Sequence, residues 1–164
     1  MWLWAAEMKP NNVTRLLDAH QIPYTPYELP PEKLGALEAA ELLGVNPELV
    51  FKTIVVVREG RGKTLLAVVP GPAEVDLKLL AAAVEEKKLR LPTEREAEKL
   101  TGLQAGGISP LALIGRPFQV IIDETAQLFE EVYISGGQRG LNIRLSPDAL
   151  LALTGGQYAD ICRL

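Results

Sequence analysis

Residues 50–57 read Val-Phe-Lys-Thr-Ile-Val-Val-Val, and residues 64–69 read Thr-Leu-Leu-Ala-Val-Val. Both runs are apolar and rich in β-branched side chains, which favour extended backbone in a sheet. The residues between them, Arg58-Glu-Gly-Arg-Gly62, have the composition of a hairpin connection. We therefore expect two strands joined as a hairpin, and this pair is the clearest β signal in the chain.

Helices are expected where a capping side chain precedes an apolar pattern of helical spacing. Gly44 follows one such pattern and suits a left-handed helix end, because glycine has no Cβ to clash there. Five helices are expected. The first three run from Asn11 and Asn12 to about Gln21, over residues 36–43, and from Asp76 to about Val84. The fourth covers residues 94–101, after a capping box of Thr93 and Glu96, and the fifth starts at Ser146-Pro147.

Further strands are expected at short apolar runs bounded by turn residues, over 24–29, 88–91, 118–122, 131–135, 141–145 and 158–162. Pro30 and Pro31 follow the first of these and place residues 30–35 in a loop. Since both short turns and helices connect the strands, the predicted fold class is α/β of the mixed α+β kind. It has a curved mixed β-sheet with helices packed outside it.

The chain length of 164 residues suits one domain with a substantial core. Met8-Lys9-Pro10 opens the first polar stretch, so residues 1–8 are interpreted as an N-terminal extension and residues 9–164 as a single domain. No apolar run reaches the ~18 residues of a membrane helix, and the first ten residues lack the features of a secretory signal. We expect a cytoplasmic protein with no membrane contact.

Cysteine and histidine each occur once, at Cys162 and His20. These counts exclude an internal disulfide and a Cys- or His-rich zinc site, so neither a metal nor a cofactor is expected. The net charge of −4 argues against a surface built for long nucleic acids, but residues 52–95 carry nine basic and six acidic side chains. This stretch leaves a local phosphate contact open, beside the simpler interpretation of solvated helix and hairpin faces.

We do not expect a catalytic site of the Cys/His or Ser/His type, because the chain has only one histidine and one cysteine. Glycines cluster instead in Gly106-Gly107-Ile108-Ser109-Pro110 and in Ser135-Gly136-Gly137-Gln138-Arg139-Gly140. Successive glycines let backbone N–H groups converge on a carbonyl oxygen or a phosphate, although ordinary tight turns explain them equally well. Lys52 interrupts an apolar run, where it either points into a cleft toward an anionic or carbonyl partner or reaches solvent from the strand's start.

Three segments in this order, Phe51-Lys52-Thr53, 106–110 and 135–140, resemble the YbaK family of prolyl-tRNA editing-domain proteins. The likeness runs from about Lys9 to the C-terminus and includes Leu37-Glu-Ala-Ala-Glu-Leu-Leu-Gly44 and the closing Tyr158-Ala-Asp-Ile161. No single motif is unique to the family, but the ordered set is specific. The resemblance implies a curved, barrel-like mixed sheet surrounded by helices, and hydrolysis of mischarged tRNA for proline as the reaction.

The resemblance also implies roles for individual residues. Lys52 becomes the essential catalytic lysine, which anchors the terminal nucleotide or polarises the aminoacyl group, and Thr53 lines the same pocket. Gly107, with Gly106 beside it, gives a close backbone contact near the substrate carbonyl. The other implied substrate-binding residues are Tyr27 near the pocket mouth, Ser135 and Gly137 on the opposite wall, and Gly136, Arg139 and Asn142.

Asn142 departs from the family pattern, because many members carry aspartate there and asparagine bears no charge. If the aspartate contacts the substrate's α-ammonium, asparagine weakens that contact. If the aspartate only supports the loop by hydrogen bonds, asparagine can support it equally well.

The expected function is trans-acting editing, the deacylation of mischarged tRNA(Pro) with Cys-tRNA(Pro) as the preferred substrate. In this chemistry the substrate's own thiol attacks its carbonyl, and the enzyme supplies orientation and oxyanion stabilisation. Two alternatives stay open: removal of alanyl or another small aminoacyl group, and a non-catalytic module that binds a nucleotide or the aminoacyl-tRNA 3′ end. The expected partners are the acceptor end of tRNA and prolyl-tRNA synthetase, since a small acidic domain has little basic surface for reading tRNA identity.

Overall fold

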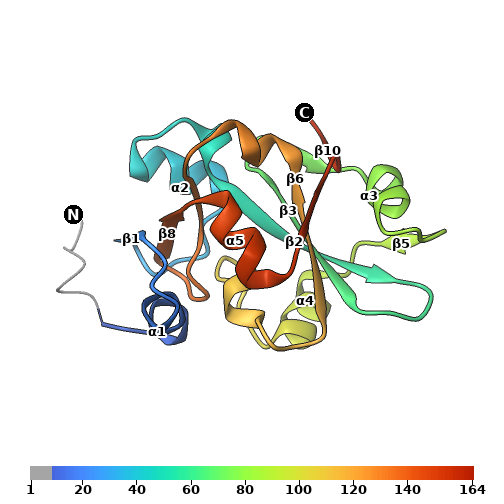
Figure 1. The fold of residues 1–164 in the computed structure, drawn as a ribbon, viewed down its shortest axis with the longest axis horizontal. Coiled ribbons are helices and arrows are strands. Elements are labelled where there is room, and N and C mark those ends of the chain that lie inside the picture. The colour runs from blue at the N-terminus through green and yellow to red at the C-terminus, as the bar shows by residue number, and fades with distance from the viewer. Residues whose placement is uncertain (1–8) are drawn as a thin grey trace.

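The hairpin of residues 50–70 lies within a five-stranded sheet in the computed structural model, which describes residues 9–164 (Figure 1). Its strands β2 (Phe51–Arg58) and β3 (Thr64–Pro70) pair antiparallel, with Lys52 opposite Val69. The sheet order is β5-β2-β3-β6-β9, in which β5 is Leu89–Arg90, β6 is Phe118–Asp123 and β9 is Gln157–Ala159. Because β6 and β9 run parallel to β3 while β2 runs antiparallel, the predicted mixed sheet is confirmed.

Two smaller sheets accompany it. The strands β1 (Tyr24–Glu28), β8 (Leu141–Leu145) and β7 (Val132–Ser135) form an antiparallel sheet in the order β1-β8-β7. The third sheet pairs β4 (Glu74–Val75) with β10 (Cys162–Arg163). Pairing among residues 9–164 does not close into a barrel, so the predicted barrel-like shape is not confirmed. The extension predicted for residues 1–8 lies outside the described residues.

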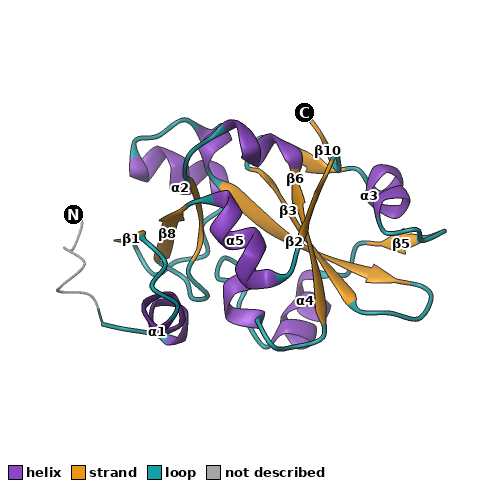
Figure 2. Ribbon diagram, viewed as in Figure 1, coloured by secondary structure: helices purple, strands orange, loops and turns teal. Residues whose placement is uncertain are grey.

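Helices are interspersed among the strands along the chain, and they lie around the strands in space (Figure 2). Helix α1 and strands β1 and β8 lie at one end of the long axis, while α3 and β5 lie at the other (Figure 1). Residues 9–164 form five α-helices: α1 (Asn12–Ala19), α2 (Ala36–Leu43), α3 (Leu77–Ala83), α4 (Glu94–Thr101) and α5 (Pro147–Thr154). Three short 3₁₀ helices are η2 (Pro47–Leu49), η3 (Pro110–Leu113) and η4 (Glu124–Leu128). No helix in residues 9–164 is long and apolar enough to cross a membrane.

The apolar run of β3 is continuous because both faces of this strand are buried. Leu66 and Val68 enter one hydrophobic cluster, while Leu65, Ala67 and Val69 enter another. The two clusters therefore occupy opposite faces of the same sheet, and the sheet separates them.

Helix caps follow the sequence closely, with two differences. Asn11, Asp76 and Ser146 each accept a hydrogen bond from the first turn of their helix, and Gly44 adopts a φ of 70°. The first helix ends at Ala19 instead of Gln21, whose φ of 55° is left-handed. The expected capping box of Thr93 and Glu96 forms only in part, because the Glu96 carboxylate binds Arg90 instead of returning to the Thr93 backbone.

The strand predicted over 158–162 is wrong as a single element. It divides into β9 and β10, which pair with β6 and β4 respectively. Between them Ile161 is fully buried, its N–H donates to Asp123 Oδ1 at 3.0 Å, and its carbonyl accepts from Asp76 at 2.7 Å. The chain breaks there because Ile161 turns into the core, and Asp123 and Asp76 satisfy its backbone.

Candidate functional site

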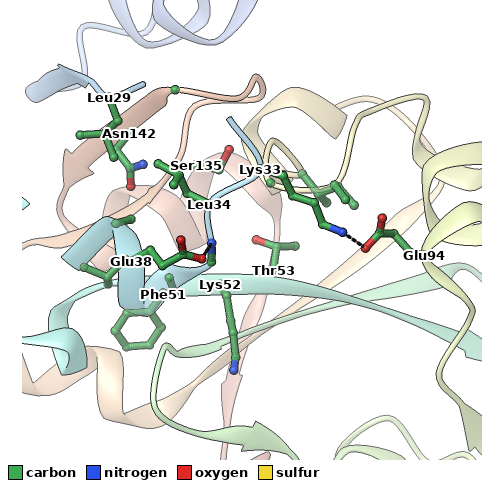
Figure 3. A pocket seen from close by; sticks show the side chains of 18 residues that line it. Leu29, Lys33, Leu34, Glu38, Phe51, Lys52, Thr53, Glu94, Ser135 and Asn142 are labelled. Atoms are coloured by element: carbon green, nitrogen blue, oxygen red, sulfur yellow. Dashed lines mark hydrogen bonds and ion pairs between the residues drawn. The ribbon is translucent and has the colours of Figure 1, made fainter. Parts of the chain in front are cut away.

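A cavity of about 490 Å³ lies where segments distant in the sequence meet (Figure 3). Its walls come from the loop before α2 and α2 itself, from the first residues of β2, from the loop at 105–108, and from the ends of β7 and β8. The side chains that line it include Leu29, Lys33, Leu34, Glu38, Phe51, Lys52, Thr53, Glu94, Ser135 and Asn142, and Gly106 and Gly140 contribute backbone.

Strand register brings two of the predicted residues together with a third. Asn142 on β8 lies opposite Ser135 on β7 and opposite Tyr27 on β1. Directly opposed residues in an antiparallel sheet point to the same face, so the three form one row across the small sheet. Ser135 and Asn142 line the cavity, whereas Tyr27 stands at the far end of the row and packs its ring 5.6 Å from that of Tyr133.

The two glycine-rich loops pack directly against each other. A Cβ on Gly107 would lie 2.9 Å from backbone atoms of Gln138 and Arg139, and Arg139 Nε donates to the Ala105 carbonyl at 2.8 Å. Gly106 lines the cavity, but Gly107, Gly136, Gly137 and Arg139 do not. These four therefore lie outside the cavity lining, and the close packing of the two loops requires a residue without a side chain at position 107.

Gly140 packs against Leu29, and both residues line the cavity. Its carbonyl accepts from the Leu29 N–H at 2.6 Å, its φ is 87°, and a Cβ there would lie 2.7 Å from the Leu29 carbonyl oxygen. Only glycine fits this left-handed position at such a short approach. The contact holds Leu29 and the residues after it beside Asn142.

Lys52 lines the cavity, but its ammonium group is directed elsewhere. Its Nζ donates to the Gly71 carbonyl at 3.0 Å. Figure 3 shows the side chains of Lys52 and Thr53 leaving β2 in opposite directions, with Thr53 on the side of Ser135. The structure therefore brings Thr53, Ser135, Asn142 and Gly106 together, and leaves the Lys52 ammonium on the other side of the strand.

Three charged side chains at the cavity were not selected from the sequence. Lys33, from the loop before α2, forms an ion pair with Glu94 on α4, and Glu38 on α2 accepts a hydrogen bond from the Gly35 N–H at 3.2 Å. The partners of the ion pair are 61 residues apart, so no local spacing signals it. Glu38 does have a local signal, since it is the one carboxylate of the first turn of α2.

Neither histidine nor cysteine lines this cavity. His20 is exposed at the end of α1, and Cys162 lies away from the cavity lining. Burial, and next the hydrogen bond to Asp123, raises the pKa of the Cys162 thiol to about 12. Within residues 9–164 no group of three or more His, Cys, Asp or Glu side chains is arranged to hold a metal ion.

The cavity thus combines the hydrogen-bonding side chains of Thr53, Ser135 and Asn142 with charged side chains at its walls. Residues 30–153 match the family described as the aminoacyl-tRNA editing domain. The chain belongs to this family. It is accordingly an enzyme of the aminoacyl-tRNA deacylase class that acts on tRNA, and the resemblance noted in the sequence is confirmed.

Individual relatives cover most of this editing-domain protein. EbsC of Enterococcus faecalis, named as a candidate Cys-tRNA(Pro)/Cys-tRNA(Cys) deacylase, is 38% identical over 152 residues, which are 92% of each chain. The proline–tRNA ligase of Thermodesulfovibrio yellowstonii is 29% identical over 109 residues, which are 66% of this chain and 18% of the ligase.

Solved structures show the same fold. A candidate trans-editing enzyme for prolyl-tRNA synthetase is 29% identical, with a TM-score of 0.77 over 96% of this chain and 100% of that one. The protein APE2540 is 26% identical, with a TM-score of 0.84 over 93% of this chain and 100% of that one. The mixed α/β fold is thus the editing-domain fold.

Proposed function

We propose that this editing-domain protein acts in trans on mischarged tRNA(Pro) and removes cysteine from it. The observation that carries the proposal is the cavity itself, which offers Thr53, Ser135 and Asn142 as hydrogen-bonding groups but no histidine or cysteine as base or nucleophile. Such a site favours a substrate that brings its own nucleophile. The 38% identical relative named for Cys-tRNA(Pro) supports the same substrate.

In the proposed reaction the sulfur of the cysteinyl group attacks the carbonyl carbon of its own ester. A carbon–sulfur bond forms, the ester bond to the terminal ribose breaks, and the thiol proton passes to the ribose oxygen. The products are free tRNA and a cyclic cysteine thioester, and neither water nor an enzyme nucleophile is consumed. The protein contributes by holding sulfur and carbonyl in reactive geometry and by donating hydrogen bonds to the developing oxyanion.

Lys52 is proposed to bind the anionic end of the substrate. Its four-carbon chain starts at the cavity wall and its present partner is a neutral carbonyl, that of Gly71. A phosphate of the terminal nucleotide offers a charge-assisted hydrogen bond, which is stronger than one to a neutral oxygen. To bind this phosphate, the Lys52 ammonium would leave the Gly71 carbonyl and turn from the far side of β2 toward the cavity, where Thr53 and Ser135 lie.

Selection of the tRNA is proposed to come from transient association with prolyl-tRNA synthetase. The chain carries a net charge of −4, which leaves little basic surface for reading a tRNA body. The relationship to a solved candidate trans-editing enzyme for that synthetase supports this partner.

The substrate assignment is tested by incubating the protein with labelled Cys-, Ala- and Pro-tRNA(Pro) and measuring the amino acid released. Substrate-thiol cyclisation predicts rapid loss of cysteine and slow loss of alanine, because alanine has no nucleophile to offer. Faster release of alanine than of cysteine would show that water is the nucleophile and would replace this mechanism.

The role of Lys52 is tested with Lys52→Ala. Removal of its charge should lower kcat/KM for Cys-tRNA(Pro) by about 10- to 100-fold, the effect expected for the loss of one charge-assisted hydrogen bond. Lys63→Ala, which changes an exposed lysine in the β2–β3 turn, is the matched control and should retain activity. Full activity of Lys52→Ala would contradict the proposed role.

A further inference from the structure

The cavity contains two carboxylates among its lining residues, and they differ in their partners. Glu94 is paired with the Lys33 ammonium. Glu38 is exposed to solvent at the cavity, its Oε1 accepts a hydrogen bond from the Gly35 N–H at 3.2 Å, and its second oxygen is bonded to no other group of residues 9–164 and so is open to a ligand. Glu38 is thus the cavity's one carboxylate without a cationic partner there, and Figure 3 shows its side chain on the α2 wall.

The substrate of an aminoacyl-tRNA deacylase carries a positive charge at a fixed place. Its α-amino group is bonded to the carbon next to the scissile carbonyl, and an α-amino group is largely or partly protonated near pH 7. Bringing this ammonium out of water costs free energy unless an opposite charge or good acceptors replace the water. Asn142 offers a neutral amide oxygen, so it supplies a hydrogen bond but no charge.

We propose that Glu38 binds the substrate's α-ammonium and so makes a free α-amino group a requirement for deacylation. Its unpartnered oxygen receives the ammonium, with the Asn142 amide oxygen as a second acceptor from the facing sheet. The inference deepens and rests on the proposed function, since it assigns the group that recognises one end of the aminoacyl moiety. It also explains why residue 142 can be neutral: Glu38 on α2 supplies the negative charge that faces the ammonium.

The substitution Glu38→Gln isolates the charge. Glutamine retains the side-chain oxygen that accepts from Gly35 N, so the N-terminal cap of α2 survives. Glu41→Gln on the same helix is the matched control, because Glu41 is exposed and does not line the cavity. Both variants should have unfolding midpoints close to that of the unmodified protein.

The decisive comparison uses Cys-tRNA(Pro) and N-acetyl-Cys-tRNA(Pro), which have the same thiol and the same ester but differ in the charge of the α-nitrogen. Glu38→Gln should lower kcat/KM for Cys-tRNA(Pro) roughly ten- to hundredfold, as expected for one charge-assisted hydrogen bond, and leave the slower N-acetyl substrate unchanged. Asn142→Asp placed in the Glu38→Gln background should restore part of the loss. An equal loss on both substrates, or no loss on either, overturns the inference.

A binding measurement separates this inference from the proposed function. The probes are 3′-cysteinylamino-3′-deoxyadenosine, whose amide resists cleavage, and its N-acetyl derivative. The unmodified protein should bind the free amine at least about tenfold more tightly than the acetylated form, and Glu38→Gln should bind the two equally. If no aminoacyl-tRNA is cleaved, the proposed function fails. Tighter binding of the free amine by the unmodified protein, lost in Glu38→Gln, would still support the role of Glu38. Equal binding of the two probes by the unmodified protein would refute that role.

Discussion

Cys162 carries a thiol that the protein keeps neutral. Burial, followed by the hydrogen bond to Asp123 and its charge, raises the pKa of the thiol to about 12, whereas the nucleophilic form of cysteine is the thiolate. Near pH 7 the side chain is therefore a weak nucleophile. Its position outside the cavity lining leads to the same conclusion.

We therefore expect Cys162→Ser to deacylate Cys-tRNA(Pro) within about twofold of the unmodified protein, because an unreactive thiol contributes nothing to the chemistry. Release of labelled cysteine measures this directly. A loss as large as that expected for Lys52→Ala would instead assign the nucleophile to the enzyme and remove the substrate-thiol mechanism.

Individual site residues were predictable from the sequence to different degrees. Thr53, Ser135, Asn142 and Gly106 line one cavity, as a common site requires. The direction of the Lys52 side chain was not predictable, because strand periodicity alone does not say which face meets the cavity. Glu38 was missed because its place in the first turn of α2 also suits a helix cap.

Among the elements, α1 has a structural connection to the Ser135–Gly140 loop. Asn11 caps α1 by accepting from the Thr14 N–H at 2.9 Å, and its Nδ2 donates to the Gly136 carbonyl at 3.0 Å. One side chain therefore fixes both the start of the helix and a loop 125 residues away that adjoins the cavity.

Asn11→Ala should lower the free energy of unfolding by about 1–2 kcal/mol, because it removes a cap and leaves Gly136 without this donor. Urea denaturation followed by circular dichroism measures the change. Asn12→Ala, at the exposed neighbouring position, should stay within about 0.5 kcal/mol of the unmodified protein. If Asn11→Ala changed the free energy of unfolding no more than Asn12→Ala does, neither the cap nor the hydrogen bond to Gly136 would stabilise the fold.

At the scale of the whole molecule, Asp76 joins the end of the chain to the rest of the fold. Its side chain accepts from the N–H groups of Lys78 and Leu79 at the start of α3, and it forms an ion pair with Arg163 on β10. The Leu79 N–H and the Arg163 guanidinium lower the pKa of this carboxyl, against the opposing effect of burial.

The lowered pKa fixes the sign of the pH dependence. The stabilisation by Asp76 is complete above the ordinary aspartate pKa of about 3.9, and it is lost as the pH falls through the folded-state value. Asp76→Asn should therefore be less stable than the unmodified protein at pH 7, and the difference should shrink as the pH falls below about 4. Urea denaturation at a series of pH values measures it, with the exposed Glu32→Gln as a control expected to show no comparable difference. A difference that stays constant with pH would exclude the carboxylate charge as its source.

The sequence by itself determined the local structure: the β2–β3 hairpin, the five helices with most of their caps, and the glycine-rich loops, because these depend on side chains a few residues apart. It also determined the family through the order of three motifs. Only the tertiary structure decided the row of Tyr27, Asn142 and Ser135, the Lys33–Glu94 pair, and the division of the last strand at Ile161. These features depend on strand register and on contacts between residues far apart in the chain. A local pattern does not encode such contacts, because packing selects among several pairings that it allows equally.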